Sequence, residues 1–314
     1  VNGIDSFPLL AVPFFILAAS IMNSSGITQR VVGLLGAMMG RLRGSSGTVN
    51  VGTNVFLAGI SGSSVADASA TGALLIPEMR KEGYTGGFSA ALTAGAALIG
   101  PILPPSIPLV IYGVIAQVSI TKLFIGGYLP ALIIAVALIV YVNWHAGRQN
   151  LAKRGTQDWR TIWRLLRSSI WALMMPILLI VGARGGFFTV TEIGAVLVVF
   201  ALFVGWIIHR EFRWKQFPAI LVDAGMQTAN ILLVVSTSSF VAYLMVVHGV
   251  PKSLMLWFQE SQLSPVAFLL IINVILLIAG AFLDSTPATI IIVPIVLPTA
   301  LALGIDPVHF GLVV

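Results

Sequence analysis

Long apolar stretches alternate with short polar segments along the whole chain, and this pattern predicts a succession of helices. A run of roughly 20 apolar residues is long enough to cross about 30 Å of hydrocarbon. The segment over residues 27–42 is glycine-spaced and flanked by arginines, which favours a helix along the membrane surface, and 250–262 resembles it. The apolar stretches together predict helices over residues 7–22 (interrupted by Pro13), 27–42, 123–144, 170–183, 192–208, 218–247 and 250–262.

Residues 59–81, GISGSSVADASATGALLIPEMRK, place Asp67 among small and hydroxylic residues. The apolar helices on either side, Val49–Ile60 and Val65–Ile76, are each too short to cross a bilayer. We therefore predict a re-entrant hairpin over residues 46–80. Its tip ends at membrane mid-depth, where irregular backbone must be buried in protein or line a cavity. The alternative is a helix pair of the soluble type joined by a Ser/Gly turn.

Two further segments depart from a plain spanning helix. Residues 88–118 are long enough to span, but the run GPILPPSIP from Gly100 to Pro108 holds four prolines. Proline lacks an amide donor and clashes with the preceding turn, so we predict a broken helix; a tight loop between two separate helices is the alternative. Residues 264–303 form a second apolar pair with the sequence DSTP at its centre, beginning at Asp284, and predict a second hairpin.

Composition places the chain among membrane proteins, because 58% of its residues are apolar, 9% are charged and the mean hydropathy is +1.01. The net charge of +6 then indicates cytoplasmic loops rich in Lys and Arg, and we expect no nucleic-acid partner. The absence of Cys excludes disulfides and thiolate metal sites. Because the sequence begins at Val1 without a Met, we expect the natural protein to extend beyond it.

The motifs of enzymes are missing from this sequence. The segment GISGSS lacks the strand–turn–helix context of a nucleophile elbow. The four His residues do not have metal-ligand spacing, and no phosphate-binding P-loop occurs. We therefore expect a transport protein without a cofactor, driven by a gradient or by other components of a complex.

The order of the predicted elements occurs twice. A helix, an interfacial segment, a hairpin with a central Asp and a further helix follow one another in residues 1–144 and again in 218–314. The pairs Asp67–Pro77 and Asp284–Pro294 have the same ten-residue spacing. Weak symmetry of this kind is typical of transporters built from repeats, with the binding site near mid-membrane. Residues 145–217 lie between the repeats and predict a basic arm helix followed by two scaffold helices.

The distribution of basic residues predicts the topology. If each hairpin returns to its own side and the broken helix crosses once, 14 of the 17 Lys and Arg residues fall on one side. Such a bias marks the cytoplasmic face. It includes the basic arm, whose apolar spacing between Trp159 and Ile170 favours an amphipathic helix at the membrane surface. The first hairpin then enters from the cytoplasm and the second from outside. The repeats are therefore predicted to be inverted, with the second one incomplete at Val314.

The predicted hairpin tip and the broken helix both offer oxygen ligands. An alkali cation needs several hard oxygens, and backbone carbonyls released from helices supply them without adding charge. Residues 61–64 and 102–106 offer such carbonyls and hydroxyls at one depth. The half-helix that begins near Ser64 points its positive end at mid-membrane, which favours an anionic substrate group. We assign structural roles to Asp67, which we expect to cap the free amides, and to Asp284, in preference to direct ligation of the cation or a proton relay.

Several motifs closely resemble a known family. They are GISGSSVAD (59–67), IPEM (76–79), GY (83–84), GPILPPSIP (100–108), YG (112–113), FLD (282–284), PIVLP (294–298) and GIDPVHFG (304–311). Over essentially the whole chain they resemble the large membrane subunit (M) of tripartite ATP-independent periplasmic (TRAP) transporters. That family has a second Pro-Pro break after the HFG segment, and this sequence ends before it.

The resemblance implies an all-α, polytopic protein of the bacterial inner membrane, with inverted repeats, re-entrant hairpins and an elevator mechanism. It implies sodium-coupled import of an organic acid anion, of the C4-dicarboxylate or sialic-acid type. A small membrane subunit (Q) and a periplasmic substrate-binding protein (P) are the implied partners. The residues expected at the first sodium site are Ser61, Gly62, Ser63, Ser64, Leu103, Pro104 and Ser106. Those expected at a second, partial sodium site are Gly280, Asp284, Ser285 and Thr286. Those expected beside the substrate are Ser63, Ser64, Pro105, Ser106, Ser285 and Thr286.

Two other functions are weighed against this one. A stand-alone inverted-repeat symporter of dicarboxylates or inorganic anions would share the hairpin plan and lack the periplasmic partner. A channel or scaffold subunit is less favoured, because a pore should show rings of charge or filter-like runs of carbonyls. The polar residues here lie in hairpin tips instead.

Overall fold

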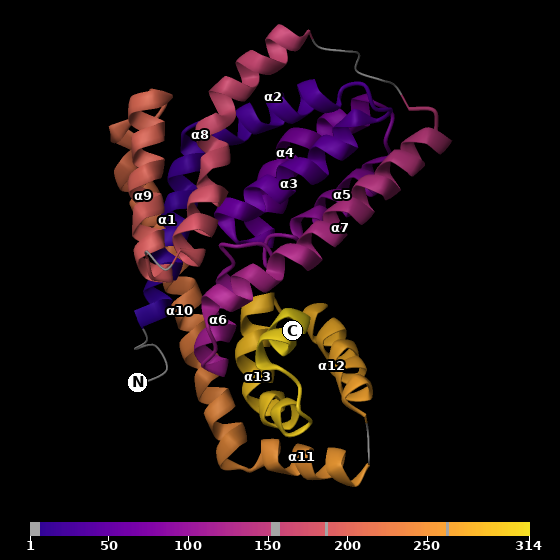
Figure 1. The fold of residues 1–314 in the computed structure, drawn as a ribbon, viewed down its shortest axis with the longest axis vertical. Coiled ribbons are helices and arrows are strands. Elements are labelled where there is room, and N and C mark those ends of the chain that lie inside the picture. Colours follow the sequence, from indigo (N-terminus) through magenta and orange to yellow (C-terminus); the bar gives the residue numbers. More distant parts are fainter. Residues whose placement is uncertain (1–6, 152–157, 186–187, 262–263) are drawn as a thin grey trace.

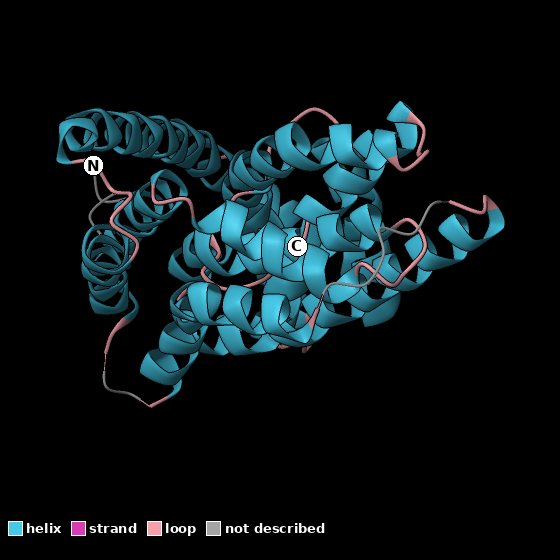
Figure 2. Cartoon of the chain, turned by 90° about the horizontal axis from the view of Figure 1, so that it is seen from above, coloured by secondary structure: helices cyan, strands magenta, loops and turns pink. Residues whose placement is uncertain are grey.

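The computed structural model describes residues 7–151, 158–185, 188–261 and 264–314, and within them every regular element is helical (Figures 1 and 2). In chain order the elements are η1 (Phe7–Leu10), α1 (Ala11–Ser24), α2 (Ile27–Met39), α3 (Ser45–Ser61), α4 (Ser64–Lys81), α5 (Gly86–Ala97), α6 (Ile107–Ala116), α7 (Ile120–Arg148), α8 (Trp159–Arg184), α9 (Val190–Phe203), η2 (Val204–Ile208), η3 (Trp214–Gln216), α10 (Phe217–Val247), α11 (Val250–Glu260), α12 (Pro265–Gly280), α13 (Ser285–Ala302) and α14 (Pro307–Val313). The predicted all-α fold is confirmed.

Several of these helices are long and apolar enough to cross a membrane. Within the described residues they are Ile120–Arg148, Trp159–Gly182, Val190–Ile208, Trp214–Val247 and Ser285–Ala302. A further crossing arises if the pair Pro8–Ser24 and Ile27–Met39, bent by 67°, counts as one span. Length and composition therefore agree with the predicted multi-pass membrane protein.

Two helices differ from the sequence-based expectation. Pro13 does not interrupt the first helix, because α1 begins at Ala11 and its first turn needs no amide donor at that position. The amphipathic segment from Trp159 and the span over 170–183 form one continuous helix, α8. Ser168 and Ser169, between the two predicted helices, are not breakers. The Ser168 hydroxyl donates to a carbonyl of its own helix, 2.8 Å away. The predicted basic arm also includes residues 152–157, which lie outside the described residues.

Helices α3 and α4 form the first hairpin and pack side by side with α5 (Figure 1). They are longer than predicted, because residues 45–48 and 77–81 extend them at the ends away from the tip. All residues of α3 except Gly52 and Val55 are buried, the polar ones included. A helix surrounded on all sides needs internal partners for its polar side chains.

Buried amides and hydroxyls supply those partners and join the three helices. The Asn50 amide donates to Thr93 of α5 at 2.7 Å, and the Asn54 amide donates to the Asn50 side-chain oxygen at 2.8 Å. Thr71 of α4 donates to Asn54 at 3.3 Å. Because buried polar groups are costly unless satisfied, this network fixes one arrangement of α3, α4 and α5.

On the other side of this hairpin, α1 packs against α9 and α10, α2 packs against both α3 and α8, and α10 packs against α13 as well. The bend between α1 and α2 is tied to the loop after α9. Arg30 donates to both carboxylate oxygens of Glu211, at 2.5 and 3.2 Å, and to the carbonyl of Ser25 at 3.1 Å. Its guanidinium also lies 3.2 Å from Nδ1 of His209. This cluster holds two segments together that are 181 residues apart in the sequence.

The helices α10 to α14 follow one another as α1 to α5 do. Left-handed glycines close the corresponding bends, at Gly26 and Gly249 (φ +67° and +72°) and at Gly83 and Gly304 (φ +103° and +74°). Helices α4 and α13 each contain 18 residues. The two tip acids do not occupy equivalent positions in this order. Asp67 is the fourth residue of α4, whereas Asp284 precedes α13 and is its N-cap residue.

Candidate functional site

The tip of the first hairpin touches the break predicted in residues 88–118, which lies between α5 and α6. Gly62 adopts φ +61°, which only glycine enters without strain. A Cβ atom at this position would collide with the carbonyl oxygen of Pro105 and lie 3.2 Å from Cα of Ser106. Helix α5 ends at Ala97 and α6 begins at Ile107, so the chain leaves the α-helix where the sequence predicts the break, an outcome that both a broken helix and a loop between two helices would give. The structure therefore brings the tip and the break together, as the sequence predicted.

Hydroxyl side chains organise the two irregular segments. The Ser63 hydroxyl caps α4 by accepting from the amide of Ala66 at 3.4 Å. The Ser106 hydroxyl caps α6 by accepting from the amide of Leu109 at 3.2 Å, and it donates to the carbonyl of Pro101. Both serines therefore stabilise helix starts that would otherwise have unpaired amides.

The predicted cap at Asp67 is wrong, because Ser63 fills that place and the Asp67 side chain turns towards α3 instead. Its Oδ1 accepts a hydrogen bond from the Ser61 hydroxyl at 2.5 Å. The carboxyl is 2% exposed, and its Oδ2 has no hydrogen-bond partner. A Cβ atom on Gly100 would lie 2.9 Å from this oxygen, so glycine is what lets the acid approach the break. Asp67 thus orients the hairpin tip.

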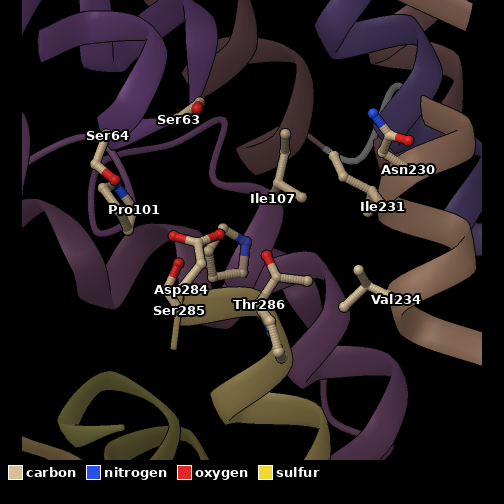
Figure 3. A pocket seen from close by; sticks show the side chains of 13 residues that line it. Ser63, Ser64, Pro101, Ile107, Asn230, Ile231, Val234, Asp284, Ser285 and Thr286 are labelled. Carbon is tan, nitrogen blue, oxygen red and sulfur yellow. The ribbon is translucent and has the colours of Figure 1, made fainter. Parts of the chain in front are cut away.

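A cavity of about 210 Å³ lies where the two tips meet α10 (Figure 3). The N-terminal ends of α4 and α13 line it from one side and the middle of α10 lines it from the other. Its lining residues are Gly62, Ser63, Ser64, Pro101, Ile107, Pro108, Asn230, Ile231, Val234, Asp284, Ser285, Thr286 and Pro287. The two helix ends, 221 residues apart at Ser64 and Ser285, thus face one space.

The predicted site residues divide into those at this cavity and those behind it. Gly62, Ser63, Ser64, Asp284, Ser285 and Thr286 line it. Ser61 lines a neighbouring cavity, whereas Leu103, Pro104, Pro105 and Ser106 belong to the break and do not line this one. Gly280 ends α12, and a Cβ atom there would meet nothing within 4 Å. The structure therefore does not bring Gly280, Pro105 or Ser106 to the cavity surface.

A second cavity of about 460 Å³ adjoins the first and shares Ser63, Ile107 and Ile231 with it. It lies between α1, α10 and the first tip, and it is lined by Ile16, Ala19, Ser20, Asn23, Ser24, Ser61, Ser63, Ala66, Ile107, Gln216, Ala219, Ile220, Asp223, Gln227 and Ile231. The larger cavity therefore extends from the first tip towards the end of α1 and the beginning of α10.

The residues of α10 in both cavities were missed by the sequence analysis. Asp223, Gln227 and Asn230 are the polar members of this set. Their spacing of four and three residues within an apolar helix was the available signal, because such residues share one helix face.

The first cavity combines helix N-termini, hydroxyl groups and one acidic side chain. Helix N-termini favour negative charge, and those of α4 and α13 both face the space. Hydroxyls of Ser64, Ser285 and Thr286 add hydrogen-bonding groups. Asp284 is the charged side chain on its lining, and the described lining residues of both cavities include no Lys, Arg or His. Among the described residues no group of three or more His, Cys, Asp or Glu side chains is placed to hold a metal ion.

Comparison with known proteins supplies the identity of the family. Residues 1–314 match the family model described as "Tripartite ATP-independent periplasmic transporter, DctM component". The chain is 39% identical to the 2,3-diketo-L-gulonate TRAP transporter large permease protein of Escherichia coli K12, over 99% of this chain and 73% of that protein. It is 37% identical to the sialic acid TRAP transporter large permease protein of Vibrio cholerae serotype O1, over 99% and 73%. It is 32% identical to the C4-dicarboxylate TRAP transporter large permease protein of Pseudomonas aeruginosa, over 98% and 72%.

These relatives are named as permeases, which agrees with the expectation of a transport protein rather than an enzyme. The family model covers the whole chain, and the relatives span its hairpins, its broken helix and α10 alike. The chain belongs to the DctM component family of the tripartite ATP-independent periplasmic transporters.

Proposed function

We propose that this chain is the translocating subunit of a sodium-coupled importer of an organic acid anion. The observation that carries the proposal is the cavity between the N-terminal ends of α4 and α13 on one side and α10 on the other. Substrates of transporters with repeats bind at such a place, where the ends of half-helices meet at mid-membrane. The relatives are named for transport of a diketogulonate, sialic acid and C4-dicarboxylates, which supports a carboxylate substrate.

The first sodium site belongs to this proposal and lies between the tip at Ser61–Ser64 and the break at 98–106. The contact of Gly62 with the carbonyl of Pro105 supports it, since both segments hold non-helical backbone there. Sodium requires hard oxygen ligands, and carbonyls released from helices supply them. The hydroxyls of Ser61, Ser63 and Ser106 already make hydrogen bonds, so we assign the principal ligands to backbone oxygens.

The second sodium site is proposed at the equivalent tip. Asp284, Ser285 and Thr286 line the cavity there and offer carboxylate, hydroxyl and carbonyl oxygens. Gly280 is the last residue of α12 and does not line the cavity, so we leave it out of this second sodium site.

The elevator mechanism is supported by two separate groups of side-chain hydrogen bonds, one within the first hairpin and one outside it. The buried network of Asn50, Asn54, Thr71 and Thr93 unites α3, α4 and α5, so this hairpin moves as one unit. The Arg30–Glu211 pair ties α2 to the loop after η2, and we assign these elements, together with α10, to the stationary wall. The cavity lies between the tips of the two hairpins and α10, where sliding of the hairpins along α10 would carry the substrate across.

The proposed partners are a small membrane subunit and a periplasmic binding protein, in the inner membrane of a bacterium. The family description supports both, since it names a tripartite and periplasmic system. The stand-alone symporter is the second candidate, and it differs in needing no delivery protein.

Uptake into proteoliposomes tests the proposal. The full-length permease, with its small subunit, is reconstituted and supplied with binding protein and labelled acid, with and without an inward sodium gradient. We expect uptake only with both the gradient and the binding protein. Uptake without the binding protein would favour the stand-alone symporter, and uptake independent of sodium would refute the coupling. In Ser63→Leu or Ser106→Leu, we expect half-maximal uptake to require more sodium, because both changes displace the tip or the break.

A further inference from the structure

The first half of α8 directs arginine and tryptophan side chains away from the rest of the protein. The exposed members of this set are Trp159, Arg160, Trp163, Arg164 and Arg167. The two tryptophans are 70% and 58% exposed. At about 100° per residue, all five side chains fall within about 140° of the helix circumference. They therefore form one continuous surface, which we call the arginine–tryptophan face of α8.

The opposite face of α8 packs on α2, and this contact fixes which way the helix is turned (Figure 1). Leu165 lies 3.8 Å from the position that a Cβ atom would take on Gly33 of α2. The Ser169 hydroxyl donates to the carbonyl of Arg30, also in α2, at 3.3 Å. Leu165 and Ser169 lie about half a turn of the helix circumference away from the middle of the arginine–tryptophan face. The packing on α2 therefore holds that face outwards.

The three arginines of this face have no anionic partner within the described part of the protein. Arg160, Arg164 and Arg167 form neither an ion pair nor a side-chain hydrogen bond with any described residue. Asp158 is the only acidic residue from position 83 to position 191 of the sequence. Like charges spaced four and three residues apart repel each other on a helix. An anion supplied from outside the chain would relieve this repulsion.

The length of α8 places the arginine–tryptophan face at the level of phospholipid headgroups. The helix has 26 residues and is therefore about 39 Å long, whereas the hydrocarbon layer is about 30 Å thick. Residues 168–183 carry no charge, so the excess of about 9 Å belongs to the end with the three arginines. Tryptophan is enriched at this depth, and long arginine side chains reach it from one turn deeper. The basic segment thus enters the headgroup layer as the extension of a spanning helix.

We propose that the arginine–tryptophan face of α8 binds the headgroup of an anionic phospholipid. In this arrangement the guanidinium groups of Arg160 and Arg164, one helical turn apart, donate to phosphate oxygens, which match their fork of N–H donors. The indole rings of Trp159 and Trp163 lie between the headgroups and the acyl chains, where an apolar ring with one N–H donor is favoured. A zwitterionic phospholipid offers the same phosphate beside a cation of its own. Net charge therefore sets the lipid selectivity.

The position of α8 gives this lipid a structural role. Because α8 packs on α2, the lipid attaches part of the proposed stationary wall to the membrane surface. A wall that is held in the bilayer gives the sliding hairpins a fixed support. The proposal goes beyond the proposed function and depends on neither the substrate nor the coupling ion.

Quenching of tryptophan fluorescence by brominated phospholipids tests the proposal. The full-length permease with its small subunit is reconstituted into bilayers of constant composition, in which either the phosphatidylglycerol or the phosphatidylcholine is brominated. Subtracting the signal of the double variant Trp159→Phe, Trp163→Phe isolates the two tryptophans of the face. We expect their association constant for phosphatidylglycerol to exceed that for phosphatidylcholine at least about fivefold, the effect of one arginine near an anionic surface.

Changing the three arginines of the face to Gln should bring this ratio of association constants to within about twofold of one. If that variant does not fold, Arg164→Gln alone should lower the ratio at least about twofold. Potassium chloride at about 1 M should also lower the ratio in the unmodified protein, because it shortens the screening length to about 3 Å.

A matched control removes the same number of charges from exposed positions on three separate elements, α4, α7 and α11. It combines Arg80→Gln, Lys122→Gln and Lys252→Gln and should keep the ratio of the unmodified protein. A ratio near one in the unmodified protein overturns the proposal, as does an unchanged ratio in the variant without the three arginines. Equal falls in that variant and the control assign the effect to overall charge and overturn the site on α8. Selectivity found only when the small subunit is omitted shows that this subunit covers the face, which also overturns the proposal.

Discussion

Replacing Gly62 by Ala should separate the first hairpin tip from the broken helix. The glycine lies in the left-handed region, at φ +61°, and a Cβ atom there would overlap the carbonyl oxygen of Pro105. That oxygen belongs to the backbone, which cannot rotate away as a flexible side chain would. The tip or the break must therefore shift.

Two costs add in this variant. A non-glycine residue in the left-handed conformation costs about 1–2 kcal/mol. Overpacking against a fixed neighbour typically costs a further 1–3 kcal/mol or so. We therefore expect Gly62→Ala to lose about 2–5 kcal/mol of unfolding free energy. Gly304→Ala is the matched control, because Gly304 has φ +74° and its Cβ would meet nothing within 4 Å, so only the first cost applies.

The assay has two readouts. Thermal unfolding in detergent, followed by tryptophan fluorescence, should show a larger fall for Gly62→Ala than for Gly304→Ala. Sodium-dependent uptake should need more sodium in Gly62→Ala, since the shift disturbs the proposed cation ligands, and should keep its sodium dependence in the control. Equal unfolding temperatures in the two variants, with unchanged sodium dependence in both, would refute the contact between tip and break.

Three further predictions follow from the buried acid, the basic cluster and the topology. Asp67→Asn keeps an acceptor for the Ser61 hydroxyl, whereas Asp67→Ala leaves that hydroxyl buried and unpaired at a cost of about 1–3 kcal/mol. The unfolding temperature should therefore fall further for Asp67→Ala than for Asp67→Asn. Equal falls would contradict a stabilising role for this hydrogen bond. Burial and the neighbouring arginine lower the pKa of His209 from its usual 6.5, so the unfolded chain binds the proton more readily and stability should decrease as the pH drops below about 6.5. His209→Gln should reduce that decrease, and an unaltered pH profile would show that the histidine is not responsible. Because the chain has no Cys, Gln149→Cys should resist an impermeant thiol reagent added outside intact cells while Ser119→Cys reacts, and the reverse pattern would invert the topology.

The hairpin tip and the break could be predicted from the sequence because their chemistry is local. Glycine, serine and proline at fixed offsets end one helix and begin the next, and Gly62 and Ser106 do so here. The role of Asp67 could not be predicted in the same way. Its place in the first turn of α4 follows from the sequence, but the direction of its side chain depends on α3, which supplies Ser61 as a partner.

The contribution of α10 required the tertiary structure. Asn230 lies 166 residues beyond Ser64 in the sequence, and its place at the cavity depends on how α10 packs against α1 and α13. Motif chemistry marks residues whose neighbours are close in sequence. An amide inside a long apolar helix has no such neighbours, so only its spacing from Gln227 hinted at a shared face.

The pairing of Arg30 with Glu211 has a consequence for biosynthesis. The ribosome adds the 181 residues that separate them before the pair can form, and at about 5–20 residues per second this takes roughly 10 to 35 seconds. During that time the first helix is in the bilayer without α9 and α10, against which it later packs. The hairpin of α3 and α4 has its partners nearby in the sequence and can assemble first. The scaffold therefore closes around a hairpin that is already formed, and a ribosome stalled before residue 190 would leave α1 accessible to membrane quality control.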